Sequence, residues 1–271
     1  MHADFLMAAA ASQGWQIPVI TPIWNALVIG IWASLAFIYS YVGDAGLSII
    51  ILTIIIRIAM IPLTWKQTKS MYEMQQLQPK IKELQAKYKK DAEKLQQETM
   101  KFYQENKVNP LGGCLPLIVQ MPVFIALYQV LSKVGNPVEL AKAGLPLTSK
   151  LAQAEIARFY FILHDLALQP QHVFQAAMKG GFSVLGLVPV IPYAILVALF
   201  SLSIYIPQRM TTTDPQQQRI GLIMAVMFLW FGWVAPAGVL LYWVTSSAWQ
   251  VGQQWLTIRI MKKRAEEAEA A

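Results

Sequence analysis

The segment LTIIIRIAMIPL, residues 52–63, places one arginine, Arg57, inside a run of aliphatic side chains. With its neighbours the apolar run covers residues 46–65, about 20 residues, which is enough helix to cross the ~30 Å hydrocarbon core of a bilayer. A cation at that depth costs at least ~2.5 kcal/mol unless water or polar groups surround it. The segment therefore predicts a membrane-spanning helix and a polar environment around Arg57.

The composition agrees with a membrane protein. Of the 271 residues, 56% are hydrophobic and 14% are charged, whereas soluble domains carry about 25% charged residues. The net charge of +7 comes from basic residues beside the apolar stretches, so orientation on the bilayer explains it better than nucleic-acid recognition. A single cysteine, Cys114, excludes an internal disulfide and a Cys-rich metal site. We expect no cofactor and no metal.

Five apolar stretches predict an all-α polytopic protein with five transmembrane helices. The predicted spans are 46–65, 110–132, 184–206, 220–235 and 238–258. The segments outside the spans are an external N-terminal segment (1–45), a cytoplasmic helical hairpin (66–109), an external loop (133–183), a cytoplasmic loop (207–219) and a cytoplasmic tail (259–271). Segment 66–109 has apolar residues every three or four positions, which predicts a helical hairpin. Within it, Asp91 is a good N-cap for a second helix that ends near Glu105.

Lysine and arginine are unevenly shared between the two sides of the predicted spans. Sixteen lie on the side of the hairpin and the C-terminus, and five lie on the other side. The positive-inside rule then places the N-terminus outside and the C-terminus in the cytoplasm. Segment 22–42 is apolar enough to cross the membrane as a sixth span, but nothing basic precedes it, so we favour a helix lying in the interface.

Enzymatic chemistry has no support in the sequence. There is no HExxH motif and no Gly-rich phosphate loop, and the predicted spans contain no Asp or Glu. Polar residues on other spans favour a polar cavity around Arg57. They are Gln120 and Gln129 on the second span and Thr245, Ser246, Ser247 and Gln250 on the fifth, where the aromatic pair Tyr242 and Trp243 lies just before them. Without an acid to neutralise it, Arg57 implies hydration or an anionic or polar guest.

Several stretches resemble the YidC-type membrane protein insertases, in the same order along the chain. They are NPLGGCLPLIVQMPVFIALYQVL (109–131), LQPKIKELQAKY (77–88), DPQQQRI (214–220) and PAGVLLYWVTSSAWQVGQQ (236–254). The resemblance implies a five-span core around a hydrophilic groove that opens to the cytoplasm and to lipid. It also implies that Arg57, Gln120 and Trp243 line this groove, where we expect Tyr242 and Ser247 to lie as well.

The resemblance therefore implies an insertase and chaperone, not an enzyme, in the bacterial plasma membrane, with a photosynthetic membrane as the other possible home. It would take nascent membrane proteins into the groove and release their helices sideways into lipid. Implied partners are those nascent chains, the lipid bilayer, the Sec translocon and the translating ribosome, the last held weakly because the tail KKRAEEAEAA is short and mixed in charge. The alternative is a small-solute or anion transporter or channel that uses Arg57 as a binding site.

Overall fold

A computed structural model describes residues 20–89, 91–106, 115–133, 151, 159, 162–179, 184–211 and 215–270. These residues form helices and one isolated bridge between Phe159 and Leu163, with no strand among them. The helices are α2 (Ile20–Val42), α3 (Ala45–Ala59), α4 (Ile61–Lys87), α5 (Ala92–Glu105), α6 (Leu115–Leu131), α9 (Pro170–Lys179), α10 (Val184–Leu187), the 3₁₀ turn η2 (Val188–Val190), α11 (Ile191–Thr211), α12 (Pro215–Val234) and α13 (Ala237–Ala270). The predicted all-α class is confirmed.

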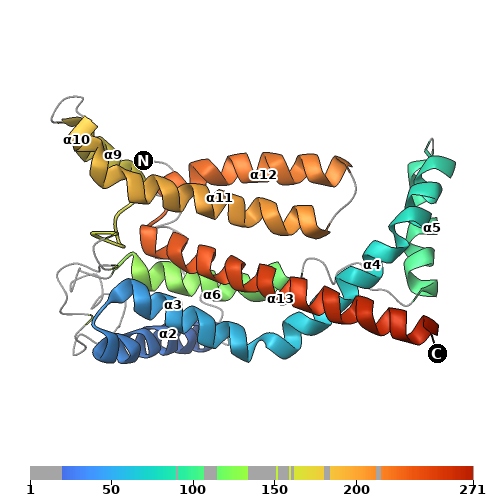
Figure 1. The fold of residues 1–271 in the computed structure, drawn as a ribbon, viewed down its shortest axis with the longest axis horizontal. Coiled ribbons are helices and arrows are strands. Elements are labelled where there is room, and N and C mark those ends of the chain that lie inside the picture. Colours follow the sequence, from blue (N-terminus) through green and yellow to red (C-terminus); the bar gives the residue numbers. More distant parts are fainter. Residues whose placement is uncertain are drawn as a thin grey trace.

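Helix α13 forms the centre of the bundle. It contacts α3 and α4 on one side, α6 on another and α11 on a third, while α12 packs on α11 and α2 packs on α3 and α6. Figure 1 shows α11 and α12 side by side above α13, with α2 and α3 below it. The hairpin of α4 and α5 and the C-terminal end of α13 extend from the same end of the bundle, opposite α9 and α10.

Helix α2 covers the segment 22–42. Its buried face includes Trp32 and Leu35, each 1% exposed, whereas Phe37 and Tyr41 on other faces are exposed. Residues Pro22–Val42 are long and apolar enough to cross a membrane. A turn with Gly43 at φ +70 then leads into α3, where the carboxylate of Asp44 accepts the N–H of Leu47 at 2.8 Å. The interfacial position of this segment stays a prediction.

The predicted span 46–65 is not one straight helix. Helix α3 ends at Ala59, and α4 leaves at an angle of 66° from Ile61. Pro62 stands in the first turn of α4, and its ring removes an N–H and clashes with the carbonyl four residues earlier. Hydropathy alone does not predict this break, because the residues on both sides of it are apolar. By length and hydropathy, the described residues contain two helices able to cross, Pro22–Val42 and Val188–Arg209, or three if α3 and α4 count as one.

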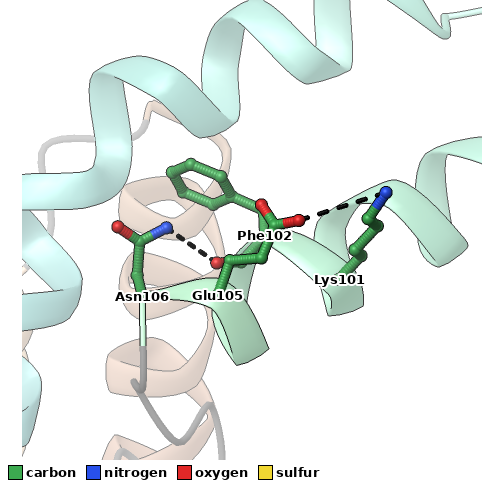
Figure 2. A network of polar contacts seen from close by, with 4 residues as sticks. All are labelled: Lys101, Phe102, Glu105 and Asn106. Atoms are coloured by element: carbon green, nitrogen blue, oxygen red, sulfur yellow. Dashed lines mark hydrogen bonds and ion pairs between the residues drawn. The ribbon is translucent and has the colours of Figure 1, made fainter.

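The helical hairpin has the predicted local structure. The carboxylate of Asp91 accepts the N–H of Lys94 at 3.0 Å, which caps α5 as expected. At the other end of α5, the side-chain amide of Asn106 donates to the carbonyl of Phe102 at 2.8 Å, and Lys101 pairs with Glu105 at 4.0 Å (Figure 2). A side chain therefore satisfies one backbone group at each end of α5.

Segment 163–169 covers the N-terminal end of α13. The amides of Gly238 and Ala237 donate to the carbonyls of Leu166 and Leu168 at 2.8 and 3.0 Å, and the side chain of Leu166 is 1% exposed. The hydroxyl of Tyr193 donates to the carbonyl of Asp165 and accepts its amide. Burial raises the pKa of the Asp165 carboxyl above its ordinary 3.8, against a lowering by the hydrogen bond from Ala167.

Candidate functional site

Arg57 lies in the last turn of α3 and points into the bundle. It is 7% exposed, and its Nε donates to the hydroxyl of Ser246 on α13 at 2.8 Å, with a second hydrogen bond from its Nη2 to the same oxygen. Thr53 lies four residues earlier on the same face and is also buried. The predicted polar environment of Arg57 is therefore built from a hydroxyl on the central helix.

A second polar contact joins α6 to α13 beside the arginine. The amide Nε2 of Gln120 donates to the hydroxyl of Tyr242, which is 1% exposed. The same hydroxyl faces Ser246 and the charge of Arg57. Three helices thus contribute to one continuous polar cluster, which we call the arginine cluster and define as Arg57, Gln120, Tyr242 and Ser246.

The arginine cluster contains no carboxylate. The ion pairs of the described residues are Lys69–Glu73, Lys101–Glu105 and Lys263–Glu267, all on exposed helix surfaces, and none involves Arg57. A buried cation held only by neutral groups keeps a positive potential that a carboxylate partner would cancel. The site can therefore attract an acidic or polar group.

Trp243 faces a different environment from its neighbour Tyr242. Its ring makes edge contacts with Phe124 on α6 at 5.2 Å and Phe200 on α11 at 5.7 Å, and it lies 6.3 Å from Phe228 on α12. Successive helix residues point about 100° apart, so a polar face and an aromatic face of α13 lie side by side. Trp243, next to Tyr242 of the arginine cluster, thus contacts rings from α6, α11 and α12.

The structure brings three of the predicted site residues, Arg57, Gln120 and Tyr242, into the arginine cluster. Ser247 is buried at 8% exposure, but among the hydrogen bonds of the described residues the guanidinium binds Ser246 instead. Ser246 is among the polar residues predicted around Arg57, although Ser247 is the serine expected in the groove. Tyr242 and Ser246 are four residues apart and share a helix face, which is the pattern that favours Ser246. No group of three or more His, Cys, Asp or Glu residues that could hold a metal is present in the described ranges.

Comparison with known proteins places the chain in a family. Residues 37–265 match the family described as 60Kd inner membrane protein. Three similar curated proteins are named membrane protein insertase YidC, from Actinobacillus pleuropneumoniae serotype 3 (37% identical over 241 residues), Haemophilus ducreyi (35% over 258) and Vibrio cholerae serotype O1 (37% over 233). The alignments cover 86%, 93% and 85% of this chain but only 37%, 39% and 36% of those relatives.

The fold is also similar to a solved structure. A crystal structure of an active YidC insertase with its first transmembrane domain resolved aligns with a TM-score of 0.56 and 24% identity, over 92% of this chain and 52% of the other. At that identity the likeness concerns the fold. The family match covers most of the chain, and the helical bundle agrees with it. The chain therefore belongs to the 60Kd inner membrane protein family, and the three relatives described above are named membrane protein insertases.

Proposed function

We propose that this protein is a membrane protein insertase and chaperone. It receives nascent membrane proteins from the cytoplasmic side, holds their polar segment at the arginine cluster and releases their hydrophobic helices sideways into lipid. The observation that carries the proposal is the buried, acid-free arginine cluster inside an apolar bundle, in a chain whose relatives are named insertases.

The costly step of insertion is the passage of a polar segment through hydrocarbon. Each unsatisfied polar group in that region costs several kcal/mol. Hydrogen-bond donors within the bundle shorten the distance that the polar segment must cross through hydrocarbon. Arg57 attracts acidic or polar groups of the guest because no carboxylate of the arginine cluster neutralises its charge. The partition of the guest's apolar helix into lipid supplies the driving force, so the protein needs no bond-breaking chemistry and is not an enzyme.

The aromatic contacts of Trp243 suggest where the guest leaves. Outer faces of α11 and α12 are apolar and exposed, with Ile195, Leu199, Ile223 and Trp230 each more than 40% exposed. A helix that leaves the arginine cluster past Trp243 meets these faces and lipid together. Such a surface offers packing without hydrogen bonds, so it retains a hydrophobic guest only weakly.

The proposal includes an orientation, a location and partners. The protein lies in the bacterial inner membrane with its N-terminus outside and the α4–α5 hairpin and C-terminus in the cytoplasm, because sixteen basic residues lie on that side. It works alone or with the Sec translocon, and it meets translating ribosomes. The interfacial position of 22–42 and the five spans belong to the same proposal.

Site-specific photo-crosslinking tests the proposed function. A photoreactive amino acid replaces Gln120 or Trp243, and ribosome-bound nascent chains of a short single-span protein are presented to membranes that contain the variant. We expect crosslinks that follow the guest's transmembrane segment and disappear once the guest is mature in lipid.

A matched control places the same amino acid at Phe37, which is 64% exposed on α2, a helix that packs on α3 and α6 and lies outside the proposed exit along α11 and α12. Crosslinks to the guest at Gln120 but few at Phe37 support a defined route. Equal crosslinking at all three positions, or none at Gln120 and Trp243 in a well-expressed variant, contradicts the proposal. In that case an ion-flux assay tests the transporter alternative.

A further inference from the structure

Helices α3 and α4 pair with α13 in parallel and in a constant register. The hydrogen bond from Arg57 to Ser246 joins residues 189 apart in sequence, and so does the bond from the Nε2 of Gln253 to the hydroxyl of Thr64 at 2.5 Å. The two layers are seven residues apart on each helix, which is a heptad interval. The register therefore continues across the bend at Met60 onto α4.

The side chains of the second layer are polar on both helices. The indole of Trp249 donates to Oε1 of Gln253 at 3.2 Å, so Gln253 is held from two sides. Three neighbouring residues are buried, with Gln67 on α4 and Gln254 and Thr257 on α13 being 4%, 5% and 1% exposed. We call this region the glutamine seam and define it as Thr64, Gln67, Gln253, Gln254 and Thr257.

The glutamine seam contains a hydrogen-bond donor that is not used. The amide Nε2 of Gln67 is buried and has no hydrogen-bond partner among the described residues. Folded proteins rarely leave such a group unpaired, because its desolvation is not compensated. An unused amide donor suits a carbonyl or carboxylate oxygen.

We propose that the glutamine seam is a second polar binding site, in which the Nε2 of Gln67 donates to a carbonyl or carboxylate oxygen of the guest's polar segment on its way to the arginine cluster. The inference rests on the proposed insertase function and adds a residue and a place to it. Polar contacts hold the seam, so α4 and α13 separate there at little cost, because water or the guest replaces each hydrogen bond. The break at Met60 lets α4 move without disturbing α3.

The test replaces Gln67 with leucine, which has a similar size and no donor. We expect the Gln67→Leu variant to be at least as thermally stable as the parent in lipid nanodiscs, because an uncompensated polar group is removed. We expect it to insert a single-span guest with a polar outer segment about fivefold more slowly, the effect of one lost hydrogen bond. The matched control is Gln76→Leu on the exposed side of α4, which should change neither quantity.

Two results would overturn this inference. One is a Gln67→Leu variant that inserts the guest at the parental rate. The other is a loss of insertion that only parallels a loss of thermal stability, which assigns Gln67 a packing role.

Photo-crosslinking from Leu63 gives a measurement that leaves Gln67 intact. Leu63 is four residues before Gln67, on the same face of α4, and it is 36% exposed. Crosslinks from Leu63 to the polar segment of the guest support the seam. Crosslinks from Gln120 without any from Leu63 reject the seam and leave the insertase function standing, whereas the absence of both rejects the insertase function itself.

Discussion

Charge reversal at Arg57 is the sharpest test of how the arginine cluster works. Arg57→Glu replaces the cation with an anion, whereas Arg57→Lys keeps the charge and loses the paired contact with Ser246. If the positive potential attracts acidic residues of the guest, the two variants should differ strongly with an acidic guest. If Arg57 only holds α3 to α13, they should behave alike.

The expected magnitude follows from the burial of the site. Two unit charges 4 Å apart interact by about 1 kcal/mol in water and about 4 kcal/mol at an effective dielectric constant of 20. Arg57 is 7% exposed, so we take about 2 kcal/mol for an acidic side chain that reaches it, between those limits. Arg57→Glu loses this attraction and adds a repulsion, so insertion should slow by at least about 30-fold. Arg57→Lys should stay within about fivefold of the parent.

The assay measures insertion of a single-span guest with one acidic residue in its outer segment, by protease protection in membranes with matched amounts of each variant. A second guest carries asparagine in place of the acid. With that neutral guest, Arg57→Glu and Arg57→Lys should differ by less than about threefold. Equal insertion of the acidic guest by both variants would refute the electrostatic reasoning and leave Arg57 a structural role.

Three further predictions concern stability in lipid nanodiscs and the hairpin. A Cβ at Gly238 would lie 3.3 Å from the carbonyl oxygen of Leu166, whereas a Cβ at Gly252 meets nothing within 4 Å. Gly238→Val should therefore lower the free energy of unfolding by about 1–3 kcal/mol, and Gly252→Ala should raise it by up to ~1 kcal/mol. Equal melting temperatures for the two variants would contradict this. Because the pKa of Asp165 is raised, its contribution to stability is fully present below the ordinary pKa of 3.8 and is lost as pH rises through the pKa of the folded state. Asp165→Asn, which keeps an oxygen acceptor for the amide of Ala167, should therefore flatten the dependence of the melting temperature on pH above 3.8. An unchanged pH profile would show that another group is responsible. Asp91→Ala should destabilise α5 by about 1 kcal/mol. The measurement is amide hydrogen exchange, which should become faster in residues 92–95 and stay unchanged in α13. Unaltered exchange in residues 92–95 would mean that the cap contributes nothing.

Local sequence patterns predicted much of the fold. The helical class, the apolar stretches that became α6, α11, α12 and α13, and the cap at Asp91 depend on neighbours a few residues apart, which hydropathy and capping chemistry describe well. Arg57 stood out for the same reason, as a charge within an apolar run. The bend at Met60 also has a local cause in Pro62, although hydropathy does not predict it.

The partners of these residues were decided by tertiary structure. Arg57 meets Ser246, and Thr64 meets Gln253, across 189 residues of sequence, and a one-residue shift of α13 would bring other side chains to the same places. Trp243 and Tyr242 are adjacent in sequence, yet Trp243 packs against aromatic rings and Tyr242 belongs to the arginine cluster. The difference arises because the two residues point to different faces of α13, which contact different side chains. Sequence alone therefore determined a helical membrane protein with a buried arginine. Packing around α13 decided which polar groups surround that charge, and it left the side-chain amide of Gln67 without a hydrogen-bond partner in the part of the chain that the structure describes.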